Sequence, residues 1–378
     1  MRQARRNSAS SFSFVAAGAR TDVIVGHGYA GLESRLASIA PGRWFLITSK
    51  KIFKLHGPRI SAGGGAQLDA RPLFVPDGEA AKTWPVLGRL LEELVRRGLR
   101  RDGGVVAFGG GTVGDVAGLA AALVLRGVPV VQAPTTLLAA ADSALGGKTA
   151  VDLPSGKNLA GAFHAPRLVV VDTSVLGTLP LRAYRSGLAE VVKSSFLDAG
   201  FHRAMARLEA PLRARESAAV AEAIRRSLAV KARAVSIDPF ERMGERAALN
   251  LGHTVGHALE TASGHRLQHG EAVAWGLLAA LRLSVARAGL APGLADAMAE
   301  RVLSLVAPPA PSAAAVRGTP GRFAADKKAD RSGLRAVLLA APGRSRLVRT
   351  ERAELAGAFA EALARYNRVG WVSPEYRV

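Results

Sequence analysis

Short apolar runs alternate with stretches of helical periodicity over residues 21–171. Strands that alternate with helices are typical of a mainly parallel sheet covered on both faces. The alternation therefore predicts an α/β domain of the nucleotide-binding kind over residues 21–180. The extended runs are Thr21–Gly26, Trp44–Thr48, Arg71–Val75, Val105–Phe108, Val128–Gln132 and Leu168–Val171, and the helical stretches are Leu32–Ile39, Glu79–Arg97 and Val113–Leu125.

After about Pro180 the pattern changes to long helical stretches. We therefore place a domain boundary near residues 178–184 and predict a mostly helical second domain over residues 181–378. Residues 307–320, rich in Pro, Ala and Ser, are expected to form a loop, and residues 1–20 a disordered tail, with order beginning at Thr21. Helices are expected at Tyr184–Leu197, Ser217–Val235, Ala247–Ala262, Glu271–Ala288 and Leu294–Val306, and extended segments at Arg335–Leu339 and Arg346–Val348.

Composition narrows the classes of function. The chain has no cysteine, which excludes disulfides and thiolate metal sites and fits a reducing cytoplasm. No apolar run is long enough to predict a membrane span. The net charge of +21 comes from scattered basic residues, and aromatic residues are few. We interpret this charge as a solvated surface with a few cations used for anionic substrates, and expect no nucleic-acid partner.

Three glycine-rich segments are candidate phosphate sites. Gly109–Asp115 follows an expected strand and opens an expected helix, where backbone N–H groups can meet a pyrophosphate. A tight structural turn would explain these glycines equally well. Lys148 follows Gly146-Gly147 and Lys157 follows Gly156, and two lysines in glycine-rich loops suit a phosphorylated ligand.

A group of histidines is a candidate metal site. His253 and His257 are four residues apart and share one face of a helix, on which Asn250 and Glu260 would extend a polar stripe. His269 follows shortly before the next apolar helix. A lone histidine is more often an ordinary core or surface residue, and Glu190 with Lys193 could be a surface ion pair. Together, however, Glu190, His253 and His269 would form a two-histidine, one-carboxylate metal set with open positions.

Several short motifs follow one another along the chain: Gly109–Asp115, Arg126-Gly127, Pro134–Thr136, Gly146–Thr149, Gly156–Asn158, Gly161–Phe163, Ala189–Lys193, Asn250–His257 and His269–Glu271. Their ordered combination resembles the 3-dehydroquinate synthase family, within the sugar-phosphate cyclases, over roughly residues 70–340. This resemblance implies an N-terminal Rossmann-like domain that binds NAD and a helical C-terminal domain that binds Zn²⁺ or Co²⁺.

The resemblance also implies roles for individual residues. The metal ligands are Glu190, His253 and His269. The NAD contacts are Asp77, Glu79, Lys82, Gly111, Thr112, Val113, Gly114, Asp115, Thr135, Thr136, Asp142, Lys148, Lys157, Val175, Leu176, Gly177 and Thr178. The substrate residues are Lys148, Asn158, Lys193, Lys231, Arg246, Asn250, His257 and one or both of Lys327 and Lys328. Arg126 would reach the phosphate site of the neighbouring subunit in a homodimer. Val191–Ser195 departs from the family's usual Lys-Tyr-Gly, and matching Lys231 requires a one-residue shift.

The implied reaction converts a phosphorylated sugar acid, 3-deoxy-D-arabino-heptulosonate 7-phosphate, into 3-dehydroquinate and phosphate in the shikimate pathway. NAD would be reduced and reoxidised within each turnover. Three alternatives stay open. The first is a related cyclase that makes 2-deoxy-scyllo-inosose or 2-epi-5-epi-valiolone. The second is a metal-dependent alcohol dehydrogenase, and the third, suggested by charge alone, is a nucleic-acid-binding protein.

Overall fold

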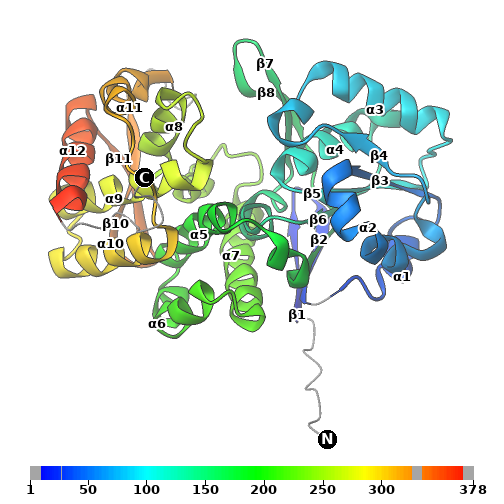
Figure 1. Cartoon of the computed structure of the whole chain (residues 1–378), viewed down its shortest axis with the longest axis horizontal. Helices are drawn as coiled ribbons and strands as arrows, with labels where there is room; N and C mark the ends of the chain where they lie inside the picture. The colour runs from blue at the N-terminus through cyan, green and yellow to red at the C-terminus, as the bar shows by residue number, and fades with distance from the viewer. Residues whose placement is uncertain (1–9, 27, 326–333, 369–378) are drawn as a thin grey trace, which may run out of the picture. The chain divides into compact units, whose positions relative to one another are not determined.

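A computed structural model describes residues 10–26, 28–325 and 334–368. The chain divides into two compact units, drawn together in Figure 1 and described separately here. Unit 1 comprises Met1–Leu179 and Val220–Phe240, and unit 2 comprises Pro180–Ala219 and Glu241–Val378. The division differs from the expected one because most of helix α7 (Ser217–Ile237) belongs to unit 1. Phe240, just after this helix, packs edge-on against Phe163 of unit 1 with ring centroids 5.5 Å apart.

Unit 1 is built on a seven-stranded sheet in the order β1-β2-β9-β6-β5-β3-β4. All neighbours from β2 to β4 pair in parallel, as the sequence predicts. The strands are β1 (Ser10–Ala16), β2 (Ala19–Gly26), β3 (Trp44–Ser49), β4 (Leu73–Val75), β5 (Gly104–Gly109), β6 (Val130–Pro134) and β9 (Leu168–Asp172). Besides most of α7, the helices of this unit are α1 (Leu32–Ile39), α2 (Lys50–Gly64), α3 (Trp84–Arg96) and α4 (Gly111–Leu123), with short turns η1 (Gly65–Gln67), η2 (Gly78–Ala81), η3 (Val124–Arg126), η4 (Ala139–Ser143) and η5 (Thr173–Thr178).

The central strands are buried on both faces. Side chains alternate along a strand, so Phe45 and Ile47 face one side, where they pack with α3 and α4. Phe108 contacts Tyr29, just before α1, edge-on on the other side, with ring centroids 5.9 Å apart. This two-sided cover confirms the predicted α/β class and explains why these strands are continuous apolar runs.

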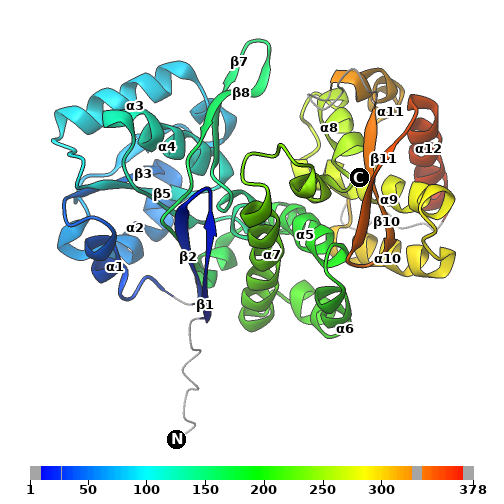
Figure 2. The ribbon, with the colours of Figure 1, turned by 180° about the vertical axis from the view of Figure 1, so that it is seen from behind.

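The disordered tail expected over residues 1–20 is wrong for residues 10–20, whereas residues 1–9 lie outside the described residues. Residues 10–16 form β1, which pairs antiparallel with β2 and closes one edge of the sheet (Figure 2). The alternating sequence Ser-Phe-Ser-Phe-Val gives this segment strand periodicity, and Gly18, with φ of 75°, makes the tight turn to β2. A second hairpin that was not predicted, β7 (Lys148–Leu153) with β8 (Gly156–Phe163), carries the lysine-containing glycine loops.

Unit 2 is mostly helical, as predicted, and α9 forms its centre. Helix α9 is buried over nearly all of its length and packs against α5, α8, α10 and α12. The predicted 307–320 loop contains a short helix, α11. The elements are α5 (Leu181–Phe196), α6 (Ala199–Arg213), α8 (His253–Ala262), α9 (His269–Arg287), α10 (Pro292–Val306), α11 (Ala313–Gly318), α12 (Arg352–Arg368), η6 (Glu245–Asn250), η7 (Pro320–Ala325) and the hairpin β10 (Arg335–Ala341) with β11 (Arg344–Arg349). Among the described residues, no helix is both long and apolar enough to cross a membrane.

The single helix expected over Ala247–Ala262 is wrong. Gly252, with φ of 77°, interrupts it between η6 and α8, so that α8 begins at His253. A left-handed residue cannot continue a right-handed helix. Asn250 therefore does not share a helical stripe with His253, whereas His257 and Glu260 do.

Candidate active site

Helices α5 and α9 are held together at the point where they carry Glu190 and His269. Arg182 donates to both carboxylate oxygens of Glu271, at 2.6 and 2.8 Å. One turn further along α5, Ser186 Oγ accepts from Gly270 N at 3.1 Å. Gly270 allows this approach, because a Cβ there would clash with the carbonyl oxygen of Ser186. The next turn of α5 carries Glu190, which is thereby placed beside His269.

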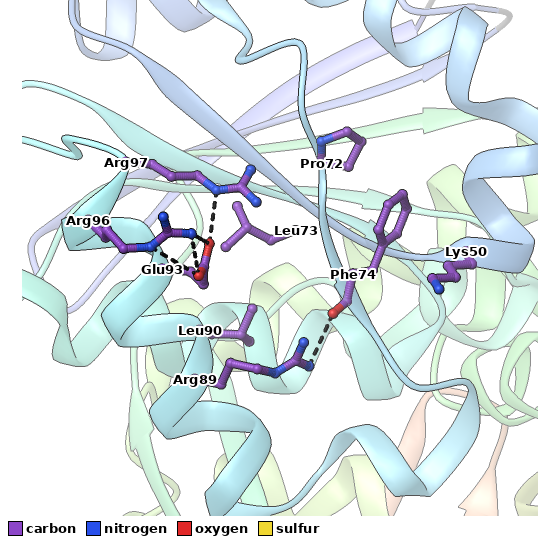
Figure 3. A pocket seen from close by; sticks show the side chains of 9 residues that line it. All are labelled: Lys50, Pro72, Leu73, Phe74, Arg89, Leu90, Glu93, Arg96 and Arg97. Atoms are coloured by element: carbon purple, nitrogen blue, oxygen red, sulfur yellow. Dashed lines mark hydrogen bonds and ion pairs between the residues drawn. The ribbon is translucent and has the colours of Figure 1, made fainter.

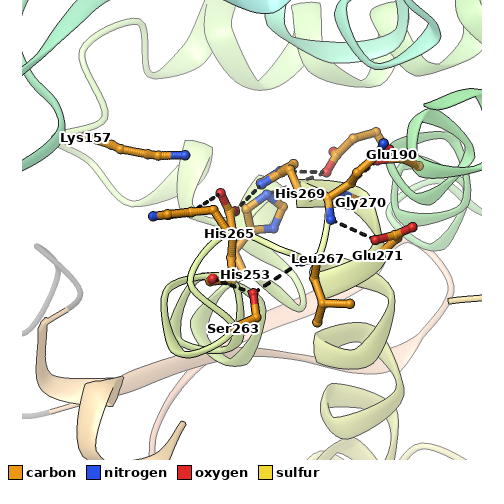
Figure 4. A network of polar contacts seen from close by, with 12 residues as sticks. Lys157, Glu190, His253, Ser263, His265, Leu267, His269, Gly270 and Glu271 are labelled. Atoms are coloured by element: carbon orange, nitrogen blue, oxygen red, sulfur yellow. Dashed lines mark hydrogen bonds and ion pairs between the residues drawn. The ribbon is translucent and has the colours of Figure 1, made fainter. Parts of the chain in front are cut away.

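Glu190, His253 and His269 form a possible metal site (Figure 4). One ligand atom from each residue lies within 4.8 Å of the others. Nε2 of His253 and Nε2 of His269 are each 3.6 Å from Glu190 Oε1. Glu190 comes from the middle of α5, His253 from the start of α8 and His269 from the start of α9. Packing of these three helices therefore assembles the set.

The other ring nitrogen of each histidine faces an oxygen. His253 Nδ1 lies 3.1 Å from the carbonyl oxygen of Leu251, and His269 Nδ1 lies 3.1 Å from Glu260 Oε2. When Nδ1 donates to these oxygens, the Nε2 lone pair is left for a metal. Glu260 was not among the predicted site residues, although its place on the α8 stripe was visible in the sequence.

The charges of the cluster also suit a divalent cation. Glu190 is buried, and neither carboxylate oxygen has a hydrogen-bond partner of normal geometry among the described residues. Burial alone would raise its pKa, but its ion pair with Lys193, together with the two histidines, holds the pKa well below the ordinary value. Burial and Lys193 hold the pKa of His253 well below its usual range, so this imidazole is neutral. An ionised carboxylate beside imidazoles fits Zn²⁺ or Co²⁺.

Three other predicted substrate residues lie in unit 2. The His257 ring is exposed and lies near both metal-site histidines, with centroids 5.1 Å from His253 and 5.8 Å from His269. Arg246 is buried in η6. Asn250 Nδ2 donates to Glu241 Oε1 at 3.3 Å. Lys327 and Lys328 lie outside the described residues.

In unit 1, buried Lys82 connects predicted cofactor and substrate residues. Its Nζ donates to Asp115 Oδ2 at 2.6 Å and to Asn158 Oδ1. Burial raises the pKa of Asp115, although Lys82 acts in the opposite direction. Lys231 of α7 donates to the carbonyl oxygen of Asp142 at 2.7 Å and pairs with its carboxylate.

The predicted phosphate turn has the expected geometry. Gly111 starts α4 directly after β5, and Gln132 Nε2 donates to the carbonyl oxygen of Gly114 at 3.1 Å. A Cβ on Gly114 would lie 2.8 Å from Gln132 Oε1, so any larger residue here would displace the end of the Gln132 side chain. The remaining predicted cofactor residues lie in four places: Thr112 and Val113 in the first turn of α4, Asp77 and Glu79 at η2, Thr135 and Thr136 after β6, and Val175, Leu176, Gly177 and Thr178 in η5. Glu79 pairs with Lys157 at 3.4 Å, and the exposed Lys148 begins β7.

A basic hollow of about 410 Å³ lies beside β4 and is lined by none of the predicted cofactor residues (Figure 3). Arg89 Nη2 donates to the carbonyl oxygen of Phe74 at 3.2 Å, and Glu93 pairs with Arg96 and Arg97. Lys50, Arg96 and Arg97 thus line one hollow, although they are far apart in sequence.

Comparison with known proteins decides the family. The 3-dehydroquinate synthase N-terminal family matches residues 72–186, and the 3-dehydroquinate synthase C-terminal family matches residues 187–329. The chain is 49% identical over 267 residues to 3-dehydroquinate synthase of Xanthomonas axonopodis pv. citri, covering 67% of this chain and 71% of the relative. It is 43% identical over 342 residues to the Paracoccus denitrificans enzyme, covering 87% and 92%. The chain belongs to the 3-dehydroquinate synthase family. It is therefore an enzyme, a lyase.

Solved structures share the fold of this 3-dehydroquinate synthase family member. A 2-deoxy-scyllo-inosose synthase complexed with carbaglucose-6-phosphate, NAD⁺ and Co²⁺ aligns with a TM-score of 0.79 at 24% identity, covering 93% of this chain and 99% of that one. A 2-epi-5-epi-valiolone synthase from Streptomyces hygroscopicus with NAD⁺ and Zn²⁺ bound aligns at 0.80, also at 24% identity, covering 91% and 97%. A probable glycerol dehydrogenase from Sinorhizobium meliloti aligns at 0.62 and 18% identity, covering 96% and 99%. At these identities the likeness concerns the fold alone.

Proposed function

We propose that the chain converts 3-deoxy-D-arabino-heptulosonate 7-phosphate into 3-dehydroquinate and phosphate, using NAD and Zn²⁺ or Co²⁺. The observation that carries this proposal is the Glu190–His253–His269 set, in which Glu190 and His253 are buried, in a chain 43–49% identical to 3-dehydroquinate synthases. When bound, the metal would polarise the C5 hydroxyl, and NAD would accept a hydride from C5 and return it after phosphate has left.

The residues of the chain have separate tasks in this proposal. Glu190, His253 and His269 hold the metal, and Lys193 keeps the buried Glu190 ionised. Lys82 and Asp115, with the helix N-terminus at Gly111, bind NAD. The remaining cations and amides hold the phosphate and carboxylate of the substrate: Lys148, Asn158, Lys231, Arg246, Asn250 and His257. In this proposal, part of the net positive charge of the chain binds the anionic groups of the substrate.

The alternatives differ in the substrate and in the fate of NADH. The fold alone does not separate them, because both related cyclases and a glycerol dehydrogenase align over almost the whole chain. Arg246 and Lys231 suit a substrate carboxylate, which the sugar phosphates used by the related cyclases lack. A dehydrogenase would release NADH, whereas the proposed reaction restores NAD in each turnover.

Phosphate release tests the proposal. The purified protein should release phosphate from heptulosonate phosphate without net accumulation of NADH, and a chelator or removal of NAD should stop it. Release from glucose 6-phosphate would favour the related cyclases. Net NADH formation from a simple alcohol would favour the dehydrogenase.

The proposal includes a homodimer in which Arg126 serves the partner's site. Arg126 is exposed, and both it and Leu125 have left-handed backbones, with φ of 68° and 52°. Two consecutive non-glycine residues in this region are unusual, and residues of this kind cluster at functional sites. Closed two-fold dimers are the commonest oligomers, which supports this reading.

A further inference from the structure

Asp152 has been given no role so far, although it lies between residues proposed to bind NAD and substrate. In the β7–β8 hairpin, Val151 pairs with Ala160 while Leu153 pairs with Gly156, so the register shifts at Asp152. Asp152 alone faces residues 157–159 of β8, so the extra residues of this bulge lie on β8 and include Asn158.

The Asp152 carboxylate contacts the backbone of Asn158, which has an unusual conformation. Asn158 has φ of 56°, in the left-handed region that side chains other than glycine rarely adopt. Its backbone N–H donates to Asp152 Oδ1 at 2.8 Å across the turn of the hairpin. A hydrogen bond to a charged acceptor is stronger than one to a neutral acceptor, so this contact can stabilise the strained residue.

The backbone of Asp152 is attached to Lys82. Asp152 N donates to the carbonyl oxygen of Lys82 at 2.8 Å. The Lys82 ammonium in turn donates to Asn158 Oδ1 and Asp115 Oδ2. Asp152, Asn158 and Lys82 therefore form a closed ring of three contacts that joins the hairpin to the end of η2.

We propose that Asp152 is a positioning residue that keeps the Asn158 side chain directed at Lys82 and ready for substrate. This inference rests on the proposed function, in which Asn158 contacts the substrate. Removal of the carboxylate leaves the backbone bond to Lys82 in place, because every residue except proline keeps the backbone N–H at position 152. Loss of the carboxylate should therefore change the position of Asn158 and leave the residues proposed to bind NAD in place.

Two variants at this position test the inference. Asp152→Ala should lower kcat/KM for heptulosonate phosphate about tenfold or more, mainly through KM. Asp152→Asn keeps an oxygen acceptor and should stay within about threefold of the natural protein. The dissociation constant for NAD⁺, measured by calorimetry without substrate, should change by less than about twofold in both. In an Asn158→Ala background, Asp152→Ala should cause no further loss, because the two residues act as one unit.

Ser155→Ala, in the exposed turn of the same hairpin, is the matched control and should behave as the natural protein. The inference is overturned if Asp152→Ala is fully active, if Asp152→Asn is equally impaired, or if the losses add in the double variant. If Asp152→Ala does not fold, as judged by thermal unfolding, Asp152→Glu replaces it, and an unchanged KM in that variant overturns the inference. A natural protein that releases no phosphate would instead refute the proposed function, and the inference with it.

Discussion

His269 Nδ1 lies 3.1 Å from Glu260 Oε2, and this contact determines which ring nitrogen faces Glu190. Partners of this kind fix the tautomer and the orientation of a metal-binding imidazole and make it a better ligand. Glu260 lies on α8, two turns after His253. The same helix therefore supplies one metal ligand, His253, and the carboxylate that orients another, His269.

Loss of this support should weaken metal binding. We expect Glu260→Ala to lower the affinity for Zn²⁺ about 10- to 100-fold. Glu260→Gln should have a smaller effect, because its amide oxygen can still accept from Nδ1. Competition with a chromophoric chelator measures the affinity. His265→Gln is the control, since His265 also contacts Glu260, at 3.3 Å, but is not in the metal set. Unchanged affinity in Glu260→Ala would remove Glu260 from this role.

Metal binding should release a proton from His269. Burial acts to lower its pKa, but the carboxylates of Glu190 and Glu260 raise it to about 10 in the metal-free protein. The ring is therefore protonated at pH 7–9 and must lose this proton before Nε2 can bind a metal. Affinity should rise with pH over this range, and about one proton should be released per Zn²⁺. Calorimetry in buffers of different ionisation enthalpy counts it, and a count of zero would contradict the prediction.

Gly270→Ala should damage the site through packing. The added methyl group would meet the carbonyl oxygen of Ser186, so α5 and α9 must separate. We expect a loss of about 1–3 kcal/mol in the free energy of unfolding and weaker Zn²⁺ binding. Urea unfolding gives the first quantity. Gly357→Ala in α12, with nothing within 4 Å of its Cβ, is the matched control and should stabilise by up to about 1 kcal/mol. Equal effects of the two changes would refute the packing argument.

Mixed dimers test the role of Arg126. Arg126→Ala and Lys148→Ala chains should each be inactive alone, because each homodimer lacks one group at both sites. A heterodimer should regain activity, since one of its sites has its own Lys148 and the partner's Arg126. Co-expression with two affinity tags isolates the mixed species for the phosphate assay. Mixed dimers that form but stay inactive would place Arg126 within its own chain.

The sequence predicted the parallel sheet well because each buried strand is a continuous apolar run. The prediction of helices from the sequence failed where a single residue interrupts a helical pattern of apolar residues. Gly252 breaks the expected helix, and a helical pattern alone does not reveal a left-handed backbone. Helix α2 was missed because Gly57, Pro58 and Gly63-Gly64 lower its apparent helix propensity, although packing stabilises it.

The possible metal set was predictable because motif spacing places its residues at helix positions. The contacts that position the site residues were not predictable, because they join segments that are distant in sequence. Arg182 meets Glu271 across 89 residues of sequence, and Lys82 meets Asn158 across 76. Neither pair has a local pattern that distinguishes it from ordinary surface charges.

The return of Val220–Phe240 to unit 1 has a consequence for chimaeric enzymes. A single crossover at residue 179 would give a hybrid whose sheet unit receives α7 from the other parent. Lys231 and Phe240 would then have to match Asp142 and Phe163 of a foreign partner. Intact exchange of one unit between family members requires three crossovers, after residues 179, 219 and 240. Recombination at one point would therefore break co-adapted contacts even where sequence identity is high.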